Sequence, residues 1–157
     1  MNPDKPIAAL NIKENSSKSL YPEPYASMMS GRTKRKLGDY FGLENIGVNL
    51  TELAPGGMSA LKHHHLKQDE FIYILSGTPT LIYGDNEYPM SPGDCFGFRK
   101  GSKMGHHLLN RSATPVMYLE TGDRTAGDVA DYPDDDICAS SNEDGKWVFT
   151  HKDGKPY

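Results

Sequence analysis

Histidine is concentrated in two short patches of this sequence. Three consecutive histidines occupy His63–His65 and two more occupy His106–His107, which accounts for five of the six in the chain. The acidic pair Asp69–Glu70 follows the first patch closely. Imidazole nitrogens together with a carboxylate oxygen form a ligand set that zinc, iron, manganese and nickel all accept. These residue types at this spacing therefore predict a site for one divalent metal ion.

A β-strand would position the first patch. Alternate residues of a strand face the same side, so His63 and His65 would point together and His64 would point away. Glu70 begins the next apolar run, and the gap after His65 leaves room for a turn that returns its carboxylate toward the same side. Asp69 would then point outward and is the alternative to Glu70 as a ligand.

A fourth ligand is expected from the second patch, which begins a predicted strand at His106–Asn110. On that strand, His106 and Asn110 share one face while His107 lies on the other. Only one of the two histidines can therefore join the first patch, and strand geometry leaves both open. The isolated His151 is predicted to be an ordinary exposed residue.

Length and composition favour one small β-rich domain. The chain has 157 residues, enough for a single core. Its 16 glycines and 11 prolines indicate short strands and turns rather than a helical bundle. A formal net charge of -4 gives no general attraction to nucleic acid or anionic lipid. With no signal peptide and no apolar run of about 18 residues, a cytoplasmic protein is expected, without nucleic acid or membrane as partner.

Short strands separated by turn residues are predicted from residue 46 onward. They are Ile46–Leu53, Phe71–Leu75, Thr80–Tyr83, Glu87–Met90, Cys95–Phe98, His106–Asn110, Val116–Thr121 and Trp147–Phe149. Because Phe71–Leu75 is continuously apolar, we expect it to be covered on both sides. Strands at this spacing are typical of a sandwich or a closed barrel. Cys95 and Cys138 are predicted to be free thiols, with Cys95 in the core.

The flanking regions differ in composition from the strands. Residues 1–31 are rich in proline and polar residues, which predicts an extended arm with one short strand at Ile7–Ile12. The basic run Arg32–Lys36 predicts a solvated face or a contact between subunits. The acidic run Asp131–Asp136 predicts a loop. The expected organisation is an arm with the first strands at 1–45, a barrel at 46–122, and a C-terminal extension of the same domain at 123–157.

The stretch 57–77 resembles the first sequence motif of the cupin superfamily at each defining position. The three metal ligands of that motif correspond to His63, His65 and Glu70. The resemblance implies an all-β fold, the double-stranded β-helix or cupin jelly-roll barrel, with the metal site inside it. The extended N-terminal arm would be an addition to this barrel.

The stretch 93–110 resembles the second cupin motif. It ends with a histidine followed four positions later by Asn110, a spacing that favours His106 as the fourth ligand. It departs from the motif in two places. Arg99 stands where proline is usual, and the loop 101–106 is two residues longer.

The segments 93–95, 105–112 and 118–120 resemble a narrower group of small single-domain bacterial cupins. Members of that group are provisionally labelled sugar-phosphate isomerases or are uncharacterised. The resemblance implies Lewis-acid chemistry on a small polar oxygenated substrate. An iron-dependent dioxygenase and a non-catalytic small-molecule-binding barrel are the alternatives.

An isomerase needs a group that moves a proton, and Tyr83, Tyr118 and Glu120 are candidates because they lie on predicted strands. An anionic substrate would need cations, and the candidates are Lys62, Arg99 and Arg111. The loop 101–105 is a candidate lid. Pairing of the arm with a neighbouring barrel would cover exposed sheet edges, so we expect a homodimer.

Overall fold

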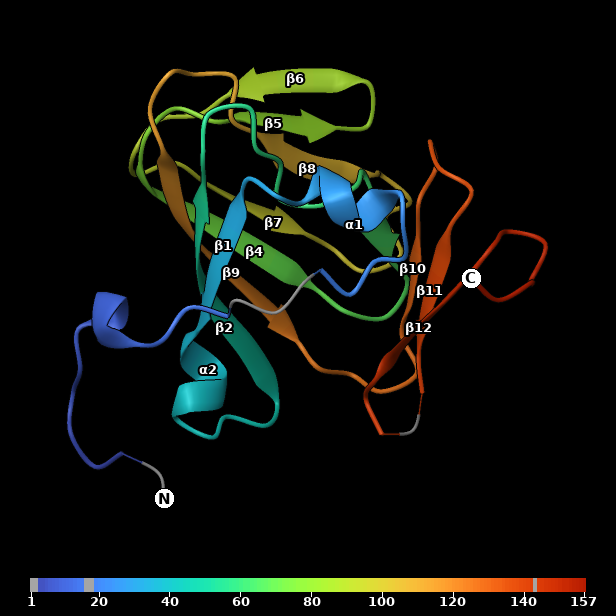
Figure 1. The fold of residues 1–157 in the computed structure, drawn as a ribbon, viewed down its shortest axis with the longest axis horizontal. Helices are drawn as coiled ribbons and strands as arrows, with labels where there is room; N and C mark the ends of the chain where they lie inside the picture. Colours follow the sequence, from blue (N-terminus) through green and yellow to red (C-terminus); the bar gives the residue numbers. More distant parts are fainter. Residues whose placement is uncertain (1–2, 16–18, 143) are drawn as a thin grey trace.

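The computed structural model describes residues 3–15, 19–142 and 144–157. Nearly all of its regular structure is antiparallel strand (Figure 1). Its elements in chain order are η1 (Ala9–Asn11), α1 (Tyr25–Met28), β1 (Arg32–Lys36), α2 (Leu37–Tyr40), β2 (Ile46–Leu53), β3 (His64–His65), β4 (Glu70–Ser76), β5 (Thr80–Tyr83), β6 (Asn86–Pro89), β7 (Cys95–Phe98), β8 (His106–Leu109), β9 (Val116–Asp123), β10 (Val129–Asp131), β11 (Cys138–Ser141) and β12 (Trp147–Thr150).

Two sheets enclose the main core. One has five strands in the order β1-β2-β9-β4-β7, and the other has three in the order β6-β5-β8. Leu53, Ile74 and Val116 from the larger sheet pack in one buried cluster with Leu81 and Leu108 from the smaller sheet. Because both sheets contribute to one core, the predicted jelly-roll barrel is confirmed.

Strand alternation explains which side chains enter this core. Along β2, Leu53 and Thr51 are fully buried, and β9 pairs Val116 with Leu53 and Tyr118 with Thr51. Directly paired residues share a face of the sheet, so these four side chains all point into the barrel. The same face continues toward the other end of each strand, where polar residues replace apolar ones.

A third sheet lies beside the barrel and holds the first histidine patch. Its order is β12-β11-β10-β3, and Figure 1 shows β10–β12 at one side of the barrel. The two-residue strand β3 is its edge, paired with β10 through His65–Ala130 and His64–Asp131. A second buried cluster supports this sheet and includes Met29, Leu61, Tyr132 and Ile137, with Tyr21 and Tyr25 of the arm packed against it.

The N-terminal region departs from the sequence prediction. A strand at Ile7–Ile12 is wrong, because Ala9–Asn11 form a single 3-10 turn and no strand partner runs beside them in the described part of the arm. The basic run Arg32–Lys36 is not a solvated face. It forms β1 and pairs with β2 along its whole length, so alternate cations point into the barrel.

Three other expectations are corrected by the observed packing. β4 is covered on one side only, since Phe71, Tyr73 and Leu75 are each about two-fifths exposed while Ile72 and Ile74 are buried. Cys95 is exposed rather than in the core, because it lies on the outer face of β7. The acidic segment is not only a loop, because strands β10 and β11 flank its turn. Among the described residues, no helix has the length and hydropathy needed to cross a membrane.

Candidate metal centre

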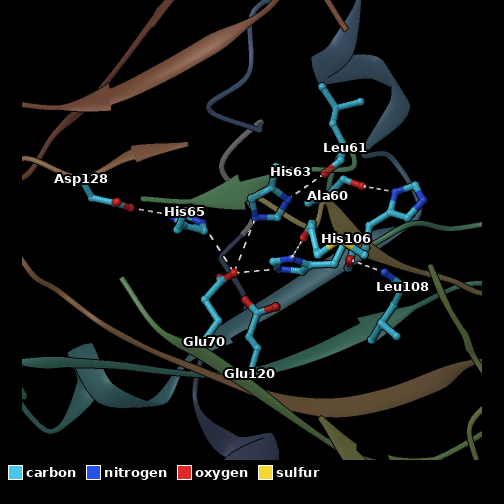
Figure 2. A network of polar contacts seen from close by, with 12 residues as sticks. Ala60, Leu61, His63, His65, Glu70, His106, Leu108, Glu120 and Asp128 are labelled. Atoms are coloured by element: carbon cyan, nitrogen blue, oxygen red, sulfur yellow. Dashed lines mark hydrogen bonds and ion pairs between the residues drawn. The ribbon is translucent and has the colours of Figure 1, made fainter. Parts of the chain in front are cut away.

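Three imidazole rings converge on one carboxylate oxygen inside the barrel (Figure 2). The Nε2 atoms of His106, His65 and His63 lie 2.9, 3.5 and 3.8 Å from Oε2 of Glu70. The ligand atoms of His63, Glu70 and His106 are all within 4.8 Å of one another. Metal–ligand bonds of about 2.0–2.2 Å place the ligands of one ion about 3–3.5 Å apart. The spacing of His63, Glu70 and His106 fits one shared ion, and His65 lies next to this group through its contact with Glu70.

Backbone pairing sets this convergence. His63 and His106 form an isolated antiparallel bridge, with amide-to-carbonyl distances of 3.2 Å in one direction and 2.8 Å in the other. Glu70 is the first residue of β4, on the face that carries buried Ile72. The Phe98 ring stacks on the His106 imidazole with 3.6 Å between centroids and 5° between planes. Strand β4 therefore positions the Glu70 side chain, and strands β7 and β8 together fix the orientation of the His106 ring.

Hydrogen bonds at the far side of two rings fix their protonation. His63 Nδ1 lies 2.8 Å from the carbonyl oxygen of Leu61, and His65 Nδ1 lies 2.5 Å from Oδ2 of Asp128. Both partners are acceptors, so in the neutral rings each Nδ1 carries the proton and each Nε2 presents a lone pair toward Glu70. Lone pairs facing a carboxylate oxygen repel it unless a proton or a cation lies between them. This arrangement fits a metal ion.

The electrostatics of the cluster favour a neutral His63 and an ionised Glu70, but they favour protonation of His65. Burial lowers the pKa of His63 to about 3, so this imidazole is neutral. Burial acts to raise the pKa of Glu70, but the contacts with His106, His65 and His63 outweigh it and hold this pKa well below its ordinary value. For His65, burial is outweighed by the hydrogen bond to Asp128 and by nearby Glu70, so its pKa is raised.

The alternative ligands lie elsewhere. His64 faces the opposite side of β3, with Nε2 3.4 Å from Asp131. His107 donates from Nδ1 to the carbonyl oxygen of Ala60. Asp69 points outward and accepts a hydrogen bond from the amide of Lys100. The structure thus brings together the four side chains selected from the sequence and separates them from their neighbours.

Asp128 and Tyr132 border the cluster and were missed by sequence reasoning. Asp128 has no exposed surface and accepts hydrogen bonds from His65 and from the amide of Lys67. Tyr132 stacks over the His63 ring with 5.7 Å between centroids. Tyr132 belongs to the segment expected to be a loop, Asp128 lies just before it, and no local motif marks either residue.

Glu120 lies beside the cluster on the same inner face. It pairs with Ile72 in the register between β9 and β4, one step along the face from Glu70, and Figure 2 shows its carboxylate next to that of Glu70. Tyr118 donates to Oε2 at 3.1 Å, and Asn49 donates to Oε1 at 3.2 Å. Lys34 forms an ion pair with Oε1.

Tyr83 packs its ring on Phe96 and Phe98, with 5.0 and 6.2 Å between centroids. These contacts of Tyr83 are with aromatic rings of the core, and none of them orients its hydroxyl toward the cluster. Of the three candidates for proton transfer, Glu120 is therefore the one whose polar group is both held by hydrogen bonds and adjacent to the cluster.

The predicted substrate-binding cations are engaged or exposed. Lys62 pairs with Asp134 at 3.3 Å, and the exposed Arg111 makes two bonds of 2.6 and 2.9 Å with Glu87. Arg99 is exposed. The candidate lid is attached to the cluster, since the amide of Gly101 donates to the carbonyl oxygen of His65 at 2.8 Å.

Comparisons with known proteins agree with this geometry. The family described as Cupin domain matches residues 49–122. A sugar phosphate isomerase from a cupin superfamily, of Silicibacter pomeroyi DSS-3, is 38% identical, with a TM-score of 0.91 over 98% of this chain and 96% of that chain. A protein provisionally named a sugar phosphate isomerase, from Acidithiobacillus ferrooxidans ATCC 23270, is 32% identical, with a TM-score of 0.72 over 80% of each chain.

A more distant structure shares the fold alone. The polyketide cyclase RemF from Streptomyces resistomycificus is 19% identical, with a TM-score of 0.59 over 76% of this chain and 78% of that chain. No curated protein sequence matches the chain significantly.

Proposed function

Because this chain belongs to the cupin superfamily, we propose that its histidine–glutamate cluster binds one divalent metal ion for the isomerisation of a small polar, oxygenated substrate. The proposed ligands are His63, His65, Glu70 and His106, and the proposed ions are zinc, iron, manganese or nickel. The observation that carries the proposal is the convergence of three Nε2 atoms on Oε2 of Glu70. The names of the two relatives above 30% identity support the reaction class.

The residues of this chain have separate tasks in such a reaction. A divalent ion would supply Lewis acidity that polarises a substrate carbonyl. Asp128 holds the His65 ring, and Phe98 holds the His106 ring. Glu120 is the candidate to take a proton from the hydroxyl-bearing carbon next to the carbonyl and return it to the former carbonyl carbon, because its carboxylate is oriented by Tyr118. The proton of that hydroxyl would move to the former carbonyl oxygen, which balances the isomerisation.

Metal content is the direct test of the site. We expect about one ion per chain in tag-free protein by elemental mass spectrometry. The variant His65→Ala should lose the ion, because it removes one donor. The matched controls His64→Ala and His107→Ala should keep it, because those rings face away from the cluster. A metal-free wild type, or equal loss in both groups of variants, would refute the ligand assignment.

Oxygen dependence tests the reaction class. The loaded protein should interconvert members of a panel of aldose and ketose phosphates without oxygen and with more than one divalent ion. Oxygen consumption that requires iron would instead establish the dioxygenase, and a ligand that stabilises the protein but emerges unchanged would establish a binding module.

A further inference from the structure

Strand β1 brings cations into the barrel. In its register with β2, Arg32 pairs with Leu53 and Lys34 pairs with Thr51. Leu53 and Thr51 are fully buried, so their partners point to the same inner face. Arg35, one position along, points to the opposite face and pairs with Glu14 of the arm.

The two inward cations differ in their partners. Lys34 forms an ion pair with Glu120, so each neutralises the other. Arg32 donates from Nη1 to the carbonyl oxygen of Ser59, which is a neutral acceptor. Within residues 3–15, 19–142 and 144–157, no carboxylate forms an ion pair with Arg32. Its charge is therefore uncompensated, and most of its five donors are available to a ligand.

Tyr21 of the arm supplies a second donor near this guanidinium. A phenolic hydroxyl can donate one hydrogen bond to an anionic ligand. Burial raises the pKa of Tyr21, and nearby Arg32 opposes that effect. The Tyr21 ring lies 5.8 Å from that of Tyr132, which in turn stacks over His63. Arg32 and Tyr21 thus lie on the side of the interior that borders the cluster.

Solvent reaches the part of the interior beside the cluster and Lys34. The side chains of Glu70, Lys34 and Glu120 are 31%, 27% and 21% exposed, whereas Leu53 on the same face has no exposed surface. A small molecule that contacts the cluster can therefore also approach Lys34 of β1, and Arg32, two positions earlier on the same face, is partly exposed as well.

We propose that Arg32, with the Tyr21 hydroxyl, binds the phosphate group of a small phosphate monoester whose carbonyl end lies at the metal cluster. A guanidinium fork matches phosphate geometry through two parallel hydrogen bonds. The negative charges nearby do not oppose this, because Lys34 neutralises Glu120 and the bound ion would neutralise Glu70. The assignment rests on the proposed function and specifies the substrate class that it takes.

Phosphate binding tests this assignment without turnover. Inorganic phosphate would be titrated by calorimetry into metal-loaded wild type, Arg32→Gln and the matched control Arg35→Gln. Wild type and the control should bind phosphate, and Arg32→Gln should bind it about ten- to a hundredfold more weakly, because a charge-assisted pair of hydrogen bonds is lost. Tyr21→Phe keeps the ring and should weaken binding several-fold, which covers the case in which Arg32→Gln fails to fold.

The outcomes separate this assignment from the proposed function. Metal content is measured on the same samples, since phosphate can also bind a metal directly. The assignment is overturned if wild type does not bind phosphate, or if Arg32→Gln keeps its metal and binds phosphate with wild-type affinity. Neither result contradicts the proposed metal site. Arg32-dependent binding in a chain that holds no metal supports the assignment and overturns the metal proposal. Acetate that binds as well as phosphate overturns the choice of a phosphate monoester.

Discussion

The inner face of the large sheet has an apolar end and a polar end. At the polar end, Asn49 of β2 pairs with Glu120 of β9, and at the apolar end Leu53 of β2 pairs with Val116 of β9. Leu53 and Val116 have no exposed surface, whereas Glu120 is 21% exposed. The same strands therefore supply the buried apolar core at one end and the polar side chains beside the metal cluster at the other.

Tyr118 marks the boundary between the two ends. It is 1% exposed, with its ring in the main core and its hydroxyl donated to Glu120. Burial of a polar group costs free energy unless it is hydrogen-bonded, and this contact satisfies that need. The difference shows that the residues expected to stabilise the fold and the residues beside the metal cluster lie at different ends of one sheet face. A substitution at one end should therefore leave the other end largely intact.

The largest effect is expected at the apolar end. Leu53→Ala should lower the free energy of unfolding by about 2–5 kcal/mol, because it opens a cavity in a fully buried site. Chemical denaturation measures the loss, and elemental analysis of the folded variant should show unchanged metal content. Loss of metal without loss of stability would mean that the two ends are not separate.

A pH-dependent effect is expected from His63 at the polar end. Its pKa is about 3 in the folded protein against an ordinary value of 6.5, so between these values the unfolded chain binds more protons. Stability of the metal-free protein should therefore rise with pH across this window, by on the order of 1 kcal/mol per unit from this residue. His63→Gln should show a flatter profile in denaturation curves from pH 3 to 7. An unchanged slope would show that the ring is not buried neutral.

A smaller effect is expected when Asp128 is changed. Asp128→Asn should weaken metal binding about ten- to a hundredfold, since it weakens the contact that orients His65. Because Asp128 raises the pKa of His65, protons should compete with the metal less at a given pH in the variant, and its binding curve should shift to lower pH. Competition titrations at several pH values measure both, with Asp131→Asn as the control. Equal effects of the two variants would contradict the role assigned to Asp128.

The smallest effect is expected outside the barrel. Arg111 and Glu87 form a bidentate pair, but both side chains are more than half exposed. Arg111→Gln should leave the Tm, the metal content and phosphate binding at wild-type values, because exposed ion pairs contribute little. A clear loss of phosphate binding in this variant would show that the phosphate binds near Arg111 rather than at β1.

The sequence predicted the elements whose side chains alternate or turn sharply. Ile46–Leu53 is observed with the same bounds, and the hairpin of β5 and β6 is observed around Gly84. The four proposed ligands could be selected because motif spacing and alternation act over short distances. The homodimer and the cytoplasmic location stay predictions.

The misses have a common physical reason, which is that the partner of a residue lies far away in the chain. β1 contains five polar residues, and only its pairing with β2 explains why Arg32 and Lys34 face inward. β10 has three residues and little pattern of its own, yet it pairs with β3. Asp128 is an isolated aspartate until the fold places it 2.5 Å from His65, which is 63 positions earlier in the chain.

The short strand β3 also has a consequence for how the site is made during translation. His63, His65 and Glu70 leave the ribosome first and His106 follows, but Asp128 and the strand that pairs with β3 emerge later. Until then the Nδ1 proton of His65 has no acceptor and β3 has no partner strand. A nascent chain that ends at residue 122 would contain the whole family-matched region and an unfinished site. The contacts that support His65 are therefore completed only after residues 128–131 have been synthesised.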